Sequence, residues 1–187
     1  MNTKYAVIMR GIPGSGKSTF ANLLASKFLF NSVHSTDEQY IVNGKYQYDA
    51  SKAGEYHAKN LANFVESLGK GTNLVICDNT NVQVDHYQPY VIAARQHGYA
   101  VVFAEMSHPS AFEAAAINTH GVPLDVIYRM IQNWEPSQHC ATVASAQKAW
   151  ETVSALQKNK KSELRGVAGV TLVIGMLLGA LLVMASV

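Results

Sequence analysis

A glycine-rich stretch near the N-terminus has the residue types and the spacing of a phosphate cradle. It fits the pattern G-x-x-x-x-G-K-[ST] and, with the threonine that follows, consists of Gly11, Ile12, Pro13, Gly14, Ser15, Gly16, Lys17, Ser18 and Thr19. Glycines let successive backbone N–H groups point into one concavity, and a helix that begins near Ser18 adds the positive end of its dipole. The stretch predicts an ATP site in which Lys17 reaches the β- and γ-phosphates and the Ser18 hydroxyl binds Mg²⁺.

Two acidic residues follow later apolar runs and have the chemistry that phosphoryl transfer needs. Asp37 could face the γ-phosphate from the side opposite Lys17 and take the proton of an acceptor hydroxyl, or it could cap the helical segment that follows. Asp78 ends an apolar run and could hold Mg²⁺ directly or through water. The residues after it, 79–81, could also form a turn that caps the next helix.

Two histidines are candidates for substrate contacts, and each has an alternative interpretation. His57 lies one helical turn before Leu61 on an apolar face, so it is either a packed histidine or a residue that contacts the substrate. His120 falls in a loop between helices and is a candidate for a mobile lid.

Strand-like runs alternate with helical patterns, and this order places the candidate residues. Such alternation predicts an α/β fold in which a parallel sheet is covered by helices on both faces. The polar residues then gather beyond the carboxyl ends of the strands. Strands are expected at about 5–9, 32–35, 74–77 and 100–104, and helices at about 18–28, 50–68, 84–97, from Pro123 onward and at 141–158.

The charge balance and the cysteines limit the function classes. Residues 1–157 carry 11 Lys and Arg against 12 acids, so they lack the basic excess that is typical of domains that grip long nucleic acids. The chain has two cysteines, which indicates a reducing compartment, and Cys77 lies in an apolar run as a small core residue would.

The C-terminal residues have the composition of a membrane anchor. Residues 166–187 are 22 residues without a charge, long enough to cross a hydrocarbon core of roughly 30 Å. The basic segment 158–165 before them predicts a single-pass, tail-anchored protein with its N-terminal domain, 1–157, in the cytoplasm. Gly175 and Gly179 form a G-x-x-x-G pair through which a homodimer could form, although glycine is common in membrane helices.

The combined motifs resemble a known family. The glycine-rich loop, Ser35 to Glu38, Asp78 to Asn81, Gly98-Tyr99 and Asn118 to Pro123 look like the P-loop polynucleotide 5′-hydroxyl kinases of phage type. They look still more like the related ATP-binding modules of ubiquitin-ligase-binding proteins. The resemblance implies a P-loop NTPase fold, Asp37 as general base and Asp78 as a group that helps to place the acceptor hydroxyl. Asn81, His57 and His120 are then the candidate substrate-binding residues.

The sequence departs from this family at two positions where arginine is expected. Ala116 and Ile117 stand where a lid arginine would stabilise the transferred phosphoryl group, and Tyr40 stands where an arginine would bind a substrate phosphate. Arg129 is the expected replacement for the lid arginine, because it lies off the apolar stripe of its helix. A missing arginine finger can cost roughly 10³-fold or more in rate.

Three functional hypotheses follow from these residues. The first is an ATP-dependent phosphotransferase that acts on the 5′-hydroxyl of a polynucleotide or nucleotide, with Lys17, Asp37, Asp78 and Arg129 as catalytic residues. The second is a membrane-tethered nucleotide-binding switch or scaffold with little catalysis. The third is a small-molecule kinase on the same fold.

Overall fold

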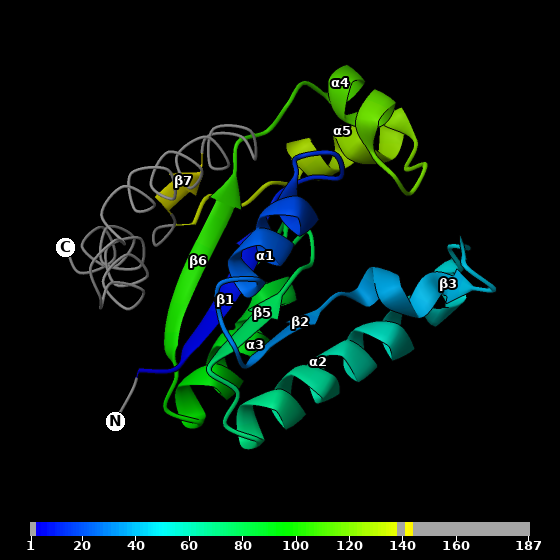
Figure 1. Ribbon diagram of the computed structural model, residues 1–187. Coiled ribbons are helices and arrows are strands. Elements are labelled where there is room, and N and C mark those ends of the chain that lie inside the picture. The colour runs from blue at the N-terminus through cyan, green and yellow to red at the C-terminus, as the bar shows by residue number, and fades with distance from the viewer. Residues whose placement is uncertain (1–2, 138–140, 144–187) are drawn as a thin grey trace, which may run out of the picture.

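The computed structural model describes residues 3–137 and 141–143. Within them, five parallel strands form one sheet in the order β2-β5-β1-β6-β7 (Figure 1). The strands are β1 Tyr5–Arg10, β2 Asn31–His34, β5 Leu74–Cys77, β6 Ala100–Met106 and β7 Ala141–Val143. The central position of β1 places the glycine-rich loop that follows it at the middle of one sheet edge.

Both faces of the sheet are covered by helices, as the continuous apolar strands predict. Ile8 and Val75 pack in a cluster with Phe64 of α2, and Val7 and Ile76 pack in a second cluster with Phe20 of α1. The helices are α1 Lys17–Ala25, α2 Ala53–Gly69 and α3 Val84–Gln96. Helices α2 and α3 share the first cluster, while α1 covers the opposite face.

A pair of helices lies over the glycine-rich loop at the carboxyl edge of the sheet. These are α4 Ala111–Ile117 and α5 Leu124–Gln132, and they form a small apolar cluster in which Ala114 and Ile127 pack with Ile12 of the loop. The turn between the helices is held by Asn118, whose side chain donates to the Ala114 carbonyl and accepts from the Val122 N–H at 2.6 Å. We call α4, α5 and this turn the lid.

Residues between β2 and α2 form a small substructure that the strand and helix patterns did not predict. It contains two 3₁₀ segments, η1 Thr36–Tyr40 and η2 Ala50–Lys52, and a hairpin of β3 Ile41–Val42 with β4 Lys45–Tyr46. Asn43 and Gly44 at the hairpin tip have φ angles of 52° and 74°, which is the backbone of a tight Asn-Gly turn. The helix expected from residue 50 therefore begins as α2 only at Ala53.

The sequence analysis predicts a helix that begins at residue 141, and this prediction is wrong for residues 141–143. Ala141–Val143 form β7, which pairs in parallel with β6 in the register Ala104↔Ala141. The backbone of these residues extends an edge of the sheet whose groups would otherwise lack a ladder partner.

The proposed membrane anchor lies outside the described residues. This applies to segment 158–165, to residues 166–187 and to the Gly175 and Gly179 pair. Among the residues that the structure does describe, no helix combines the length and the hydropathy needed to cross a bilayer.

Candidate functional site

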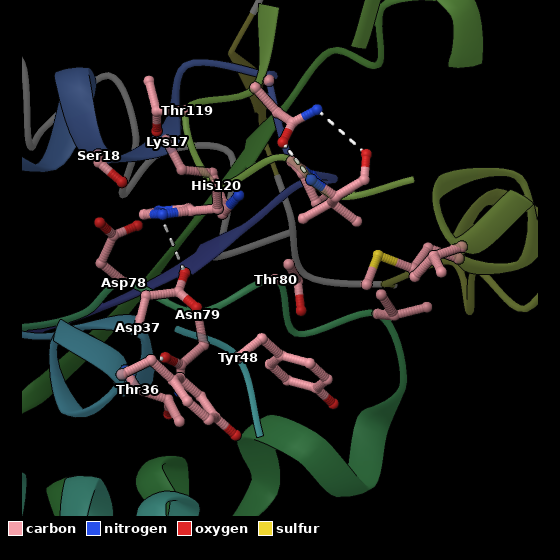
Figure 2. A pocket seen from close by; sticks show the side chains of 18 of the residues that line it. Lys17, Ser18, Thr36, Asp37, Tyr48, Asp78, Asn79, Thr80, Thr119 and His120 are labelled. Carbon is pink, nitrogen blue, oxygen red and sulfur yellow. Dashed lines mark hydrogen bonds and ion pairs between the residues drawn. The ribbon is translucent and has the colours of Figure 1, made fainter. Parts of the chain in front are cut away.

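A cavity of about 960 Å³ opens at the carboxyl ends of β1, β2 and β5, between the glycine-rich loop and the lid. Its wall includes residues of four segments that are distant in the sequence. Figure 2 shows side chains from all four around the cavity, among them Lys17, Asp37, Asp78 and His120. The fold thus brings together the groups that the sequence patterns singled out after successive strands.

The glycine-rich loop depends on glycine at two positions. Gly14 and Gly16 have φ angles of 78° and 87°, in the left-handed region that other residues rarely adopt. A Cβ on Gly14 would also come within 2.8 Å of the Ala114 carbonyl oxygen in α4. The loop and the first lid helix are therefore in close contact, and Gly16 forms the N-cap of α1.

Lys17 is buried at the base of the cavity. Its Nζ donates to the Ile12 carbonyl oxygen at 3.1 Å. Burial lowers the pKa of Lys17, while the carboxylates of Asp78 and Asp37 act in the opposite direction. A cation held between two acids in a buried site is suited to meet the negative charge of a triphosphate.

Asp78 directly follows β5 and is almost fully buried. Burial raises its pKa, against a hydrogen bond with Ser18 and the charge of Lys17. Its Oδ1 atom has no hydrogen-bond partner among the described residues. A buried carboxylate oxygen without a partner, next to a serine hydroxyl, fits a Mg²⁺ site, because this cation takes oxygen ligands and completes its shell with waters and phosphate oxygens.

Asp37 lies across the cavity from Lys17, at the start of η1. The Tyr46 hydroxyl donates to its Oδ1 at 3.1 Å, and Nε2 of His120 is 3.7 Å from its Oδ2, as the dashed line in Figure 2 marks. Ser35 is the N-cap of η1, because its Oγ accepts from the Asp37 N–H. The side chain of Asp37 therefore faces the cavity and does not act as the cap.

His57 and His120 both line the cavity, His57 from α2 and His120 from the lid. His57 of α2 is hydrogen-bonded to the Thr36 hydroxyl at 3.2 Å, and burial is the main cause that lowers its pKa. His120 of the lid stacks on the Tyr46 ring with the centroids 4.3 Å apart. The lid thus reaches the hairpin through His120.

Asn81 has a different position from the one that its motif suggested. It is buried, and its Nδ2 donates to the Met9 carbonyl oxygen at 2.7 Å, which ties the loop after β5 to β1. Asn79 and Thr80 line the cavity, whereas Asn81 lies behind the wall. Asn79 also accepts from the Thr36 N–H at 2.9 Å, so it links the ends of β5 and β2.

Arg129 lies at the rim of the cavity, on the lid helix α5. Its Nη2 forms an ion pair with Asp125 one turn earlier, at 3.1 Å, and the side chain is largely exposed. Arg129 thus lines the cavity from the lid, while its guanidinium is in contact with its own helix.

Sequence reasoning missed Tyr46 and Tyr48 as cavity residues. The signal that could have found them is the Asn43-Gly44 pair, since a tight hairpin there folds the following residues back toward Asp37. Tyr40, expected only as the replacement for an arginine, is 4% exposed and packs against Tyr46, Tyr48 and Tyr56.

Comparison with known proteins gives a family match and a close curated relative. Residues 7–136 match the family model described as the AAA domain. NEDD4-binding protein 2 of Homo sapiens is 37% identical over 132 residues, which cover 69% of this chain and 8% of that protein. The chain therefore spans a small part of the length of this relative.

Two solved structures share the fold at low sequence identity. The Mycobacterium tuberculosis APS kinase CysC, in complex with AMPPNP and APS, has a TM-score of 0.53 and 14% identity, over 84% of this chain and 99% of that one. Chaetomium thermophilum Kti12, in complex with ADP-AlF3, has a TM-score of 0.57 and 12% identity, over 88% of this chain and 100% of that one. These likenesses show an α/β P-loop fold of the kinase type.

Proposed function

Since the chain belongs to the AAA domain family, and its fold is that of P-loop kinases, we propose that it is an ATP-dependent phosphotransferase that acts on a hydroxyl group. The proposed acceptor is the 5′-hydroxyl of a polynucleotide or nucleotide, which the resemblance of its motifs to polynucleotide kinases supports. One observation carries the proposal. The Asp37 carboxylate faces the same cavity as Lys17 and the glycine-rich loop, where an acceptor hydroxyl would lie beside the γ-phosphate.

In the proposed reaction the acceptor oxygen attacks the γ-phosphorus of ATP. A bond forms between these two atoms while the bond from the γ-phosphorus to the β–γ bridging oxygen breaks, and ADP leaves with that electron pair. Asp37 takes the acceptor proton as the new bond forms. Lys17 and the backbone N–H groups of the loop hold the phosphates throughout the transfer.

Ser18 and Asp78 would hold Mg²⁺, which when bound supplies positive charge to the β- and γ-phosphates. This assignment is supported by Oδ1 of Asp78, which is buried and has no hydrogen-bond partner among the described residues. The resemblance to polynucleotide kinases implies that Asp78 helps to place the acceptor hydroxyl. Asp78 is near enough to Lys17 and Asp37 for both charges to act on its pKa, which is consistent with both tasks.

The test of the proposed function is transfer of labelled γ-phosphate from ATP to a 5′-hydroxyl oligonucleotide and to nucleosides. Asp37→Asn is expected to lower kcat by roughly 10²- to 10⁴-fold, the usual contribution of a general base, while ATP still binds. Lys17→Ala is expected to weaken ATP binding itself. Glu55→Gln changes an exposed carboxylate of α2 that is not a cavity residue, and should leave both quantities unaltered.

The position of Arg129 favours one alternative, a nucleotide-binding switch or scaffold with little turnover. Arg129 pairs with Asp125, so among the described cavity residues Lys17 is the cation left for the phosphates. If the alternative holds, Asp37→Asn leaves biological activity intact while Lys17→Ala abolishes it. No transfer to any acceptor by a wild-type protein that binds ATP would reject the phosphotransferase.

A further inference from the structure

One side of the cavity, opposite the glycine-rich loop, is made mainly of aromatic and neutral polar side chains. We call it the acceptor wall, and its residues are Thr36, Asp37, Tyr46, Tyr48, His57 and His86. We propose that the acceptor is a molecule of nucleoside size, without a phosphate, whose flat ring stacks on Tyr48 while its hydroxyl points to Asp37. This inference rests on the proposed phosphotransferase function. It keeps the 5′-hydroxyl as the reacting group but replaces the polynucleotide or nucleotide acceptor with a nucleoside, which carries that hydroxyl without a phosphate.

Tyr48 is an exposed ring that is supported from behind. It is 65% exposed although it lines the cavity, and its ring centroid is 5.0 Å from that of buried Tyr40. Tyr40 in turn packs against Tyr56 of α2 at 4.9 Å. Such support fixes the ring before a ligand arrives, so stacking costs little further side-chain entropy.

The ring of Tyr48 and the carboxylate of Asp37 lie on the same side of the cavity. Figure 2 draws Tyr48, Asn79 and Asp37 around the cavity that all three line. The two residues are joined through Tyr40 and Tyr46, since Tyr40 contacts both Tyr48 and Tyr46, and Tyr46 donates a hydrogen bond to Asp37. A base that stacks on Tyr48 would therefore have a fixed position relative to the proton acceptor.

The acceptor wall carries no cation among the described residues. The two basic residues that line the cavity are Lys17, which lies in the glycine-rich loop, and Arg129, which pairs with Asp125. Asp37 adds negative charge to the wall, and burial lowers the pKa of His57, which keeps that imidazole neutral near pH 7. Binding of a polynucleotide depends mainly on cations that neutralise its phosphates, so this wall suits an uncharged acceptor better.

The size of the cavity agrees with two small ligands side by side. Pockets for one drug-sized ligand measure roughly 300–1,000 Å³. The volume here, about 960 Å³, is at the upper end of that range, and its lining is divided between the phosphate loop on one side and the acceptor wall on the other.

The experiment compares three acceptors with the full chain: adenosine, ribose and a 5′-hydroxyl oligoadenylate ten nucleotides long. Ribose, supplied as its methyl furanoside so that the 5-hydroxyl is free, offers the same hydroxyl without a flat ring, and the oligonucleotide adds phosphates. Stacking of a base on an aromatic side chain contributes roughly 1–3 kcal/mol, which corresponds to about 5- to 150-fold in KM. Adenosine is therefore expected to have a KM at least fivefold below that of ribose, and a KM within about tenfold of the oligonucleotide's.

Variants of Tyr48 locate the stacking. Tyr48→Ala is expected to raise the KM for adenosine by at least fivefold, without a change for ribose or for ATP, while Tyr48→Phe keeps the wild-type value. Tyr128→Ala is the matched control, because Tyr128 is an exposed tyrosine that is not a cavity residue. An unchanged adenosine KM in Tyr48→Ala would overturn the proposal.

A second outcome would also overturn it, in favour of a polynucleotide. In that case the KM for the oligonucleotide would lie about a hundredfold or more below the KM for adenosine, and it would rise steeply with salt concentration.

If no acceptor is phosphorylated, the phosphotransferase function fails, and calorimetry with adenosine and AMPPNP still decides the inference. Adenosine binding that Tyr48→Ala abolishes would support the acceptor wall, and no binding of adenosine would reject it.

Discussion

Asp78 is a carboxylate that the folded protein holds at an energetic cost. Burial raises its pKa above the ordinary value of 3.8, although Ser18 and Lys17 favour the ionised form. An acid whose pKa is raised by folding binds its proton more tightly in the folded state than in the unfolded state. Above its ordinary pKa, ionisation of Asp78 therefore lowers the free energy of unfolding.

This cost predicts a variant that is more stable but inactive. Asp78→Asn removes the buried charge, so the melting temperature of the ligand-free protein at pH 7 is expected to rise by a few degrees, while phosphoryl transfer that needs Mg²⁺ is lost. The gain should vanish below pH 3.8, where the wild-type carboxyl is protonated in both states. Thermal scans at pH 7 and at a pH below 3.8 measure the difference in melting temperature from the wild type, with exposed Asp85→Asn as the control. A lower melting temperature at pH 7 would contradict the argument.

At single residues, the sequence was most informative where backbone geometry and chemistry coincide. The loop from Gly11 to Ser18 needs glycine at fixed positions, so its pattern identified one wall of the cavity without any knowledge of the fold. Tyr48 could not be found in this way. A tyrosine has no required spacing, and its value here comes from Tyr40 and Asp37, which the η1 segment and the hairpin bring close to it.

The loop before α1 lies so close to α4 that one added methyl group, at Gly14, should disturb their contact. Gly14→Ala would place a Cβ 2.8 Å from the Ala114 carbonyl oxygen and force an L side chain into a φ of 78°. Strained backbone of this kind costs roughly 1–3 kcal/mol. We expect a lower melting temperature and an ATP dissociation constant raised by about tenfold, measured by thermal scanning and calorimetry.

The control for this variant is Gly69→Ala at the end of α2. Gly69 is helical and has open space around the position of a Cβ, so alanine should leave ATP binding unchanged and stabilise the helix by roughly 0.5–1 kcal/mol. Equal ATP affinities in the Gly14→Ala and wild-type proteins would show that the loop and α4 can separate without cost.

Elements with a strong apolar pattern were predicted well. Elements that form only by pairing with another strand were not. β5 was predicted at 74–77 as observed, because both of its faces are buried and its four residues are apolar. β7 was predicted as helix, since Ala141–Val143 become a strand only through pairing with the edge of β6. The hairpin Ile41–Tyr46 is too short for periodicity to reveal, and only its Asn43-Gly44 turn could have indicated it.

Across the whole molecule, Arg10 joins segments that the fold brings together from distant parts of the chain. It is fully buried and forms an ion pair with Glu105 of β6 at 2.7 Å. Its guanidinium also donates to the carbonyl oxygens of Asn81, Val82 and Glu135, and it lies over the ring of Trp134. One side chain thus connects β1, β6, the loop after β5 and the segment after the lid.

Removal of this cation is expected to destabilise the fold as a whole. Arg10→Met leaves Glu105 and three carbonyl groups without their donor, and the loss of one partner of a buried pair costs roughly 3–5 kcal/mol. Urea unfolding measures the loss, and Arg95→Met, at an exposed position of α3, serves as the control. The double variant Arg10→Met with Glu105→Gln should recover part of the stability. A double variant less stable than Arg10→Met would argue against an unpaired charge as the cause.

The contacts of Asp37 have a consequence for the hydrolysis of ATP by water when no acceptor is bound. Tyr46 of the hairpin and His120 of the lid each approach one of its two carboxylate oxygens. In the proposed reaction, a water that enters with ATP alone would meet carboxylate oxygens that are already faced by protein groups, whereas a substrate that fills the cavity would displace those groups. ATP would then be used for transfer to the acceptor and not for hydrolysis by water. The ratio of ADP formed to acceptor phosphorylated measures how tightly the two are coupled.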